Sequence, residues 1–299
     1  MQKIDFSKII FGTAAIAGEG KGYGFGDINK QSARNLLEYA FERGIIKYDT
    51  APIYGMGLSE ERIGDFIASK RDKVEVISKA GVDWHSNGRV NMSNQPKVIS
   101  RMLTESLKRM NTDYIDVFYI HWPDPNVDIR YPLEVLFKAK EQHKILAIGL
   151  SNTNINDISL AIGSFPITHI QGECNLFNDV FKKLSTELDL DKIETQGWGT
   201  FDKGILAGSV TPTRKFDSSD CRSWAPWWKK SNWKEKCARV REFESLGHDI
   251  KSSALSYAYT RKYLTHPIIG LRTKQYIDDL ENIIIDERLA STGESFFNE

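Results

Sequence analysis

Short apolar runs alternate with longer amphipathic stretches along almost the whole chain, and this rhythm constrains the fold more than any other feature. The segment 31–43 carries apolar residues three or four apart and stops at Gly44, as an amphipathic helix does. The apolar run 45–50 after it is short and has the composition of a strand. The pattern therefore predicts strands and helices in alternation.

Eight such runs are expected to be strands, at 9–16, 45–50, 74–80, 115–122, 146–150, 169–176, 193–198 and 267–271. They lack strict polar alternation, which indicates that both faces of the sheet are covered. Strands that alternate with helices form a parallel sheet, and eight units in 299 residues fit a closed barrel. We expect one domain over 1–299 of the α/β class, a (β/α)8 TIM barrel with long variable loops at its C-terminal face. A helix is expected to begin after the second strand with Ser59 as its N-cap.

Composition narrows the range of partners. Lysine plus arginine equals aspartate plus glutamate at 40 each, so no net charge attracts nucleic acid or an anionic membrane. No apolar run approaches the roughly 20 residues that span a bilayer. The three cysteines show no CxxC spacing, which favours reduced thiols and a cytoplasmic location. The oligomeric state stays open.

Polar residues follow three consecutive strands at the barrel end where catalytic groups lie. Asp49 and Tyr54 follow the second strand, Lys79 ends the third, and His121 ends the fourth. Each has an ordinary alternative, since a lone tyrosine packs in a turn, a lone lysine is solvated and a lone histidine is structural. Together on neighbouring strand ends they predict a catalytic site.

These residue types suit carbonyl reduction, which needs a proton donor for the developing alkoxide. A free phenol has a pKa of about 10, and a nearby ammonium lowers it. We therefore expect Tyr54 to be the acid and Lys79 to lower its pKa. A carboxylate, Asp49, keeps the buried ammonium charged, and a neutral His121 orients the carbonyl.

The segments 48–55 (YDTAPIYG) and 57–60 (GLSE) resemble the signature of the aldo-keto reductase superfamily. Lys79 and His121 fall where that family places the other two members of its catalytic tetrad. The resemblance runs from the first strand to about Asn282. It implies hydride transfer between a nicotinamide and an aldehyde, ketone or sugar carbonyl, with NADPH extended across the barrel mouth.

The resemblance also implies a set of cofactor-binding residues. Ser151, Asn152 and Gln171 would hold the nicotinamide carboxamide, and Trp198 stands where the family usually has a stacking tyrosine. The loop around the pyrophosphate would contain Gly199, Thr200, Phe201, Lys203 and Gly204, with Lys203 as charge partner. Gly270 and Arg272 would lie at the adenosine 2′-phosphate. Arg272 is the reason to expect NADPH, with NADH possible.

Three departures from the family pattern bear on the cofactor. Thr200 replaces a usual proline, Cys174 replaces the common tyrosine of the sixth strand, and Leu280 stands where an asparagine often meets the adenine. All three leave the proton-transfer residues intact.

Three loops are expected to select the substrate, at 18–26, 82–96 and 209–237. The last carries Trp224, Trp227, Trp228 and Trp233. With Tyr23, Phe25, Trp84 and Trp122 they would wall a pocket that suits sugar faces as well as apolar carbonyls.

Other functions compete with a reductase. An aldose dehydrogenase would run the same chemistry in reverse, and a non-catalytic NADPH-binding subunit would keep the same residues. A metallohydrolase is the weakest alternative, because the six histidines show neither HxH nor HExxH spacing. No metal site is expected.

Overall fold

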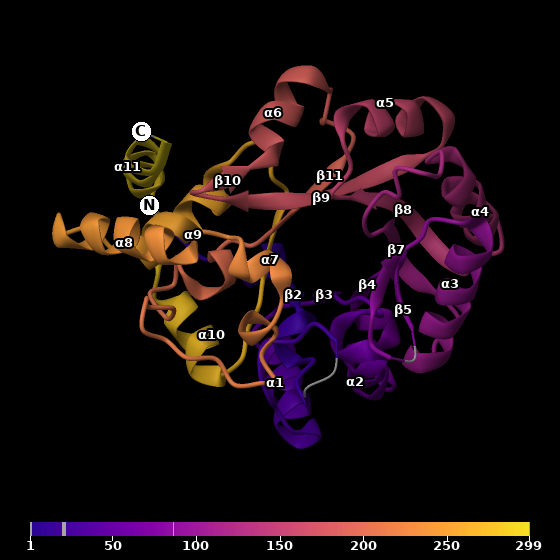
Figure 1. Cartoon of the computed structure of the whole chain (residues 1–299), viewed down its shortest axis with the longest axis horizontal. Coiled ribbons are helices and arrows are strands. Elements are labelled where there is room, and N and C mark those ends of the chain that lie inside the picture. Colours follow the sequence, from indigo (N-terminus) through magenta and orange to yellow (C-terminus); the bar gives the residue numbers. More distant parts are fainter. Residues whose placement is uncertain (1, 20–21, 86, 299) are drawn as a thin grey trace.

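The computed structural model describes residues 2–19, 22–85 and 87–298. Eight parallel strands form a ring, closed by pairing of the first and last strand of the series β9, β11, β12, β2, β3, β4, β7, β8. The strands are β2 (Ile10–Gly12), β3 (Lys47–Asp49), β4 (Glu75–Ala80), β7 (Ile115–Ile120), β8 (Ile145–Ser151), β9 (Ile167–Asn175), β11 (Glu194–Trp198) and β12 (His266–Ile269). Figure 1 shows the strands around the centre and the helices outside them. The expected (β/α)8 barrel is confirmed.

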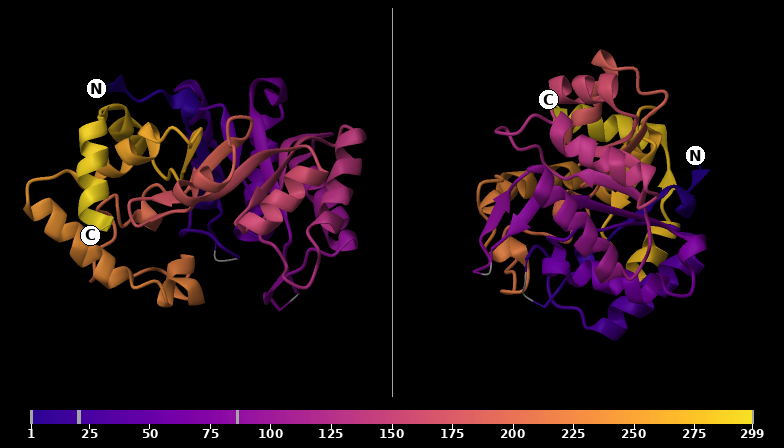
Figure 2. Two further views of the ribbon diagram at one scale, coloured as in Figure 1. Left: turned by 90° about the horizontal axis from the view of Figure 1, so that it is seen from above. Right: turned by 90° about the vertical axis from the view of Figure 1, so that its right-hand side faces the viewer.

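The helices cover the outside of the ring. They are α1 (Lys30–Glu42), α2 (Leu58–Ile67), α3 (Pro96–Met110), α4 (Arg130–Glu141), α5 (Ile155–Ser164), α6 (Val180–Glu187), α7 (Pro226–Lys229), α8 (Trp233–Ser245), α9 (Ile250–Thr260), α10 (Lys274–Glu281) and α11 (Glu287–Asn298). Helix α11 lies against α9 beside the barrel, as the two views of Figure 2 show. Among the described residues, no helix has both the length and the apolar character needed to cross a membrane.

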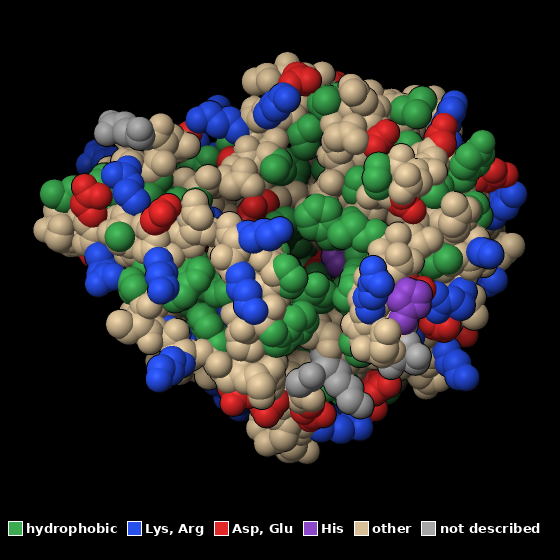
Figure 3. Space-filling view, in the orientation of Figure 1, with side chains coloured by type: hydrophobic (Ala, Val, Ile, Leu, Met, Phe, Trp, Pro, Cys, Tyr) green, Lys and Arg blue, Asp and Glu red, His purple; other side chains and the backbone are tan. Residues whose placement is uncertain are grey.

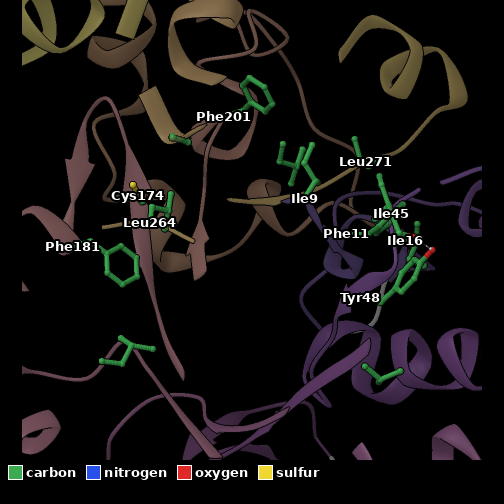
Figure 4. Close-up of a cluster of buried hydrophobic side chains, with 14 of the residues drawn as sticks. Ile9, Phe11, Ile16, Ile45, Tyr48, Cys174, Phe181, Phe201, Leu264 and Leu271 are labelled. Atoms are coloured by element: carbon green, nitrogen blue, oxygen red, sulfur yellow. Dashed lines mark hydrogen bonds between the residues drawn. The ribbon is translucent and has the colours of Figure 1, made fainter. Parts of the chain in front are cut away.

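Two hydrophobic layers hold the barrel together. The larger lies between strands and helices, and Figure 4 shows part of it, with Phe11 and Tyr48 on one side and Cys174 and Phe181 on the other. The smaller lies inside the ring, where it packs beside buried polar side chains, and contains Ile10, Ile77, Val117, Tyr119 and Ile268. The inside is therefore a packed core, and chemistry is confined to the strand ends.

Gly149 on β8 leaves room for the ring of Tyr119 inside the barrel. A Cβ at this position would lie 2.3 Å from the Tyr119 ring. Gly149→Ala is therefore expected to lower the free energy of unfolding by about 1–3 kcal/mol, because a full interior cannot accept another methyl group without strain. Urea unfolding measures this loss.

Gly163→Ala on α5 is the matched control, since nothing lies within 4 Å of its added Cβ. It should leave stability unchanged or raise it slightly, as alanine favours a helix more than glycine does. Equal stability of the two variants would show that the Tyr119 ring yields at no cost.

Three local predictions were wrong. The first strand ends at Gly12, because 13–16 turns into a 3-10 helix. Helix α2 has Gly57 rather than Ser59 at its N-cap, and Ser59 is buried inside it. The segment 82–92, which was expected to be a loop, contains a hairpin of β5 (Val82–Trp84) and β6 (Val90–Met92) that follows the C-terminal end of β4.

The buried Ser59 has a structural task. Its hydroxyl lies 2.6 Å from Thr13 Oγ1 and accepts a hydrogen bond of 2.8 Å from Thr50 Oγ1. Thr13 in turn donates to the backbone oxygen of Asp49 at 2.8 Å. These bonds fix the end of β3, where the site begins.

Candidate active site

The barrel brings the four expected catalytic residues to one end. Asp49 is the last residue of β3, Lys79 lies near the end of β4, and His121 directly follows β7. Tyr54 lies in the turn after β3, partly buried. Figure 3 shows a hollow near the centre of one face, lined by hydrophobic side chains and with a histidine at its base.

Asp49 and Lys79 form a buried ion pair, exposed by only 3% and 1%. Lys79 Nζ donates to both carboxylate oxygens of Asp49 at 2.7 Å and to the backbone oxygen of Thr50 at 2.9 Å. An ammonium has three hydrogens, so these contacts use all of them. Burial lowers the pKa of Lys79, and the charge of Asp49 opposes that effect.

The tyrosine shares this compartment but its pKa departs from the expectation. Lys79 Nζ lies 5.4 Å from the centre of the Tyr54 ring. Burial and then the charge of Asp49 raise the pKa of Tyr54 well above its ordinary value, so the expected lowering was wrong for the protein alone. Burial is the larger cause, and the negative charge of Asp49 adds to it, while the hydrogens of Lys79 point at Asp49 and Thr50. The phenol is therefore protonated at neutral pH.

The histidine is neutral, as a carbonyl-orienting role requires. Burial and then the charge of Lys79 lower the pKa of His121 well below its ordinary value. Its ring meets the Tyr54 ring edge to face, with the centres 6.0 Å apart. One neutral imidazole and one protonated phenol thus line the same mouth.

Three residues expected at the nicotinamide are joined to one another. Trp198 Nε1 donates to Asn152 Oδ1 at 3.1 Å. Asn152 Nδ2 donates to Ser151 Oγ and to the backbone oxygen of His121, both at 3.0 Å. The indole N–H of Trp198 therefore helps to orient Asn152. The tyrosine expected at this position in the family has no ring N–H and could not make this hydrogen bond. Among the described residues, no acceptor receives the hydroxyl hydrogen of Ser151, which is therefore available to a bound ligand.

Gln171 lies on β9 inside the mouth and is 2% exposed. Its Nε2 donates to Asp49 Oδ2 at 2.6 Å and to Gln196 Oε1 at 3.0 Å. Both amide hydrogens are thereby used, and among the described residues no hydrogen bond reaches its oxygen. A free hydroxyl on Ser151 and a free carbonyl on Gln171 match the acceptor and the donor of a carboxamide.

The expected pyrophosphate loop is tightly turned and crossed by ion pairs. Gly199 and Gly204 have φ of 80° and 98°, which favour glycine. Lys203 Nζ donates to Glu173 Oε1 at 2.7 Å and to Asp202 Oδ1 at 2.9 Å. Although burial lowers it, these two carboxylates raise the pKa of Lys203 above its usual value.

The neighbouring residues of this loop are buried, among them Thr200 and Phe201. Thr200 Oγ1 is buried with no hydrogen-bond partner in the part of the chain that is described. Neither Glu173 nor Asp202 was predicted as a site residue, although Glu173 lies two positions after Gln171 and Asp202 lies between Phe201 and Lys203.

Gly270 and Arg272 follow β12 at the same end of the barrel. Gly270 is exposed. The guanidinium of Arg272 donates to the backbone oxygens of Ala15, Gly26 and Asp27 at 2.9, 3.1 and 3.0 Å. Arg272 therefore holds the loop after β2. Among the residues that the structure covers, the other two of its five N–H groups have no acceptor.

The Trp-rich segment 209–236 has a buried part and a more exposed part. Trp228 and Trp233 stack on each other with ring centres 5.4 Å apart, and Trp228 is buried. Trp224 is 40% exposed and packs on Tyr23 with ring centres 5.3 Å apart. Only part of the segment thus reaches the mouth, against the loop 18–26, of which Gly20 and Lys21 lie outside the described residues.

The two loops are also joined through their backbones. Cys221 N donates to Gly24 O at 2.8 Å, and Phe25 forms an antiparallel bridge with Asp220. Tyr23 also packs, together with Tyr54 and Trp84, against a small apolar cluster that includes Ile53. These aromatic and apolar side chains therefore form a continuous wall beside Tyr54.

Comparison with known proteins agrees with this geometry. Residues 8–289 match the model of the Aldo/keto reductase family. The chain is 32% identical over 267 residues to aldo-keto reductase YhdN of Bacillus subtilis, covering 88% of this chain and 79% of that protein. It is 28% identical over 264 residues to the NADH-specific methylglyoxal reductase of Escherichia coli, covering 80% of this chain and 79% of that protein.

Among solved structures, the glycerol dehydrogenase of Gluconobacter oxydans superposes with a TM-score of 0.80 at 25% identity, covering 97% of this chain and 90% of that one. The family match spans nearly all of the barrel and includes every residue of the site described above. The chain belongs to the aldo-keto reductase family, whose members are oxidoreductases that use nicotinamide cofactors.

Proposed function

We propose that this protein reduces an aldehyde, ketone or sugar carbonyl to an alcohol with NADPH, and that Tyr54 is the general acid. One observation carries the proposal: a protonated phenol and a neutral imidazole face the same mouth, with ring centres 6.0 Å apart, beside the buried Asp49–Lys79 pair. A carbonyl oxygen that lies between the two rings would meet two hydrogen-bond donors.

A nicotinamide held by Ser151, Asn152 and Gln171 would, when bound, supply the hydride for the carbonyl carbon. As negative charge develops on the oxygen, Tyr54 gives it the phenolic proton, and His121 donates a hydrogen bond that orients it. The Asp49–Lys79 pair sets the field around the phenolate that is left behind. In the reverse direction Tyr54 takes a proton from an alcohol, so an aldose dehydrogenase would use the same groups.

The residues present fit a nicotinamide. Ser151 has a free donor and Gln171 a free acceptor for the carboxamide, and Trp198 offers an aromatic face to the ring. Arg272 supports NADPH, because two N–H groups of its guanidinium have no acceptor among the described residues and would be available to a 2′-phosphate. The NADH-specific relative in Escherichia coli keeps the opposite preference open to test.

The proposed setting is the cytoplasm, acting on a small-molecule substrate. All three cysteines are free and buried, which suits a reducing compartment. Burial raises the pKa of each thiol, so none is a ready nucleophile.

The direct test is a single-turnover assay with stoichiometric NADPH or NADH and a panel of aldehydes, ketones and sugars. We expect the reduced-nicotinamide absorbance to fall with at least one carbonyl, and faster with NADPH. Tight NADPH binding without oxidation by any carbonyl would support the non-catalytic subunit instead. Faster oxidation of NADH would overturn the role of Arg272 in cofactor choice.

A further inference from the structure

A line of polar side chains runs down the inside of the barrel below the site. Glu194, Gln196 and Trp198 alternate along β11, so all three face the interior of the ring. Gln196 is fully buried and lies opposite Gln171 in the pairing of β11 with β9. Sequence reasoning named only Trp198, although the period of two along a strand places the other two on its face.

Hydrogen bonds connect this line end to end. Gln196 Nε2 donates to Glu194 Oε1 at 2.9 Å. Gln196 Oε1 accepts from Gln171 Nε2 at 3.0 Å, and Gln171 Nε2 also donates to Asp49 Oδ2 at 2.6 Å. The chain of contacts therefore starts at the N-terminal end of the barrel and finishes at the catalytic pair.

The direction of each amide in this chain is forced. An ionised carboxylate only accepts, so Glu194 requires the NH2 of Gln196 to point at it. The oxygen of Gln196 must then face Gln171, which requires the NH2 of Gln171 to point back. Asp49 imposes the same direction on Gln171 from the other side. A reversed Gln171 would bring its oxygen against two acceptors.

Glu194 is held in the ionised state that this argument needs. Its oxygens lie 3.8 Å from Lys47 Nζ and 3.6 and 3.5 Å from the imidazoles of His169 and His266. Although burial raises it, hydrogen bonds from His169 and Gln196 and the charge of Lys47 lower the pKa of Glu194 to about 2. The acceptor end of the chain is thus constant across the neutral range.

We infer that Gln196, anchored by Glu194, is a positioning residue for cofactor recognition: it holds the Gln171 amide so that its oxygen is presented to the carboxamide NH2 of the nicotinamide. This inference rests on the proposed function, since it assumes a nicotinamide at Ser151 and Gln171. According to this inference, Gln196 and Glu194 strengthen binding of the nicotinamide half of the cofactor in particular.

The test compares the whole cofactor with a fragment that lacks nicotinamide. Binding of NADP+ and of 2′-phospho-ADP-ribose is measured by calorimetry for the wild-type protein and for Gln196→Met, which keeps the side-chain length but has no amide. We expect NADP+ to bind roughly three- to ten-fold more weakly to the variant, the loss of about one hydrogen bond. Binding of the fragment should change less than two-fold.

Two further variants keep the test decisive if Gln196→Met does not fold. Glu194→Gln replaces the acceptor with a group that can donate or accept, so the amide direction is no longer forced, and the same selective loss is expected to a smaller extent. Gln31→Met is the matched control, because it removes an exposed glutamine hydrogen bond of 2.8 Å on α1. It should leave both affinities unchanged.

The possible results distinguish a failure of this inference from a failure of the proposed function. Equal losses for NADP+ and the fragment would mean a general disturbance of the barrel, and no loss for either would mean that Gln171 needs no support, so both overturn the inference. If the wild-type protein binds NADP+ no more tightly than the fragment, and NAD+ no more tightly than ADP-ribose, the proposed nicotinamide site itself is wrong.

Discussion

Tyr54→Phe is expected to lower kcat for carbonyl reduction by about 10²–10⁴-fold, the usual contribution of a positioned general acid. The phenol is the protonated group at the mouth, because burial and Asp49 raise its pKa. His121 is too weak a base to be protonated at neutral pH, because its pKa is lowered, so it cannot replace the lost proton. Steady-state kinetics with the best carbonyl from the panel measure the effect.

Cofactor affinity separates a chemical role from a structural one. Tyr54 makes no side-chain hydrogen bond among the described residues, so its loss should leave NADPH binding and the thermal midpoint within error of wild type. Tyr131→Phe on α4 is the control, since that ring is 59% exposed. It should leave kcat unchanged. Undiminished turnover of Tyr54→Phe would refute the assignment of the acid.

The barrel was predictable because its evidence is periodic. Apolar runs repeat at the spacing of strands and helices through the chain. The covered sheet faces indicate a parallel sheet, and the number of units, eight, favours a closed barrel. Boundaries were less predictable where a tertiary contact overrides local preference. A serine is a common N-cap, but the hydroxyl of Ser59 is hydrogen-bonded to Thr13 and Thr50 inside the fold. Gly57, whose backbone is in the left-handed region, is the N-cap instead.

The site shows the same division. Residue types at strand ends were enough to bring Asp49, Lys79 and His121 together, since parallel strands end at one edge. The pKa of Tyr54 was not predictable, because it depends on how deeply the fold buries the phenol and on the nearby charge of Asp49. Gln196 was missed because a single glutamine inside a strand belongs to no sequence motif that would mark it as functional.

Breaking the Asp49–Lys79 pair is the second large effect expected. Lys79→Met leaves the Asp49 carboxylate buried without a cation and should cost about 3–5 kcal/mol of unfolding free energy. Asp49→Asn should cost a similar amount, because the buried ammonium then loses the carboxylate to which it is hydrogen-bonded and keeps the backbone oxygen of Thr50 as a partner. Lys138→Met on α4 is the control, and it should cost less than about 1 kcal/mol because the Lys138–Glu134 pair is exposed.

The double variant Asp49→Asn with Lys79→Met decides what the pair is for. Both charges are removed, and the asparagine introduced in place of Asp49 can still accept from Gln171. Stability should therefore recover most of the loss, and urea unfolding would show strong non-additivity. Catalysis should not recover, because the phenolate left by proton transfer then has no cation beside it. If kcat returned together with stability, the pair would be a scaffold alone, and the field that stabilises the phenolate would have to come from elsewhere in the mouth.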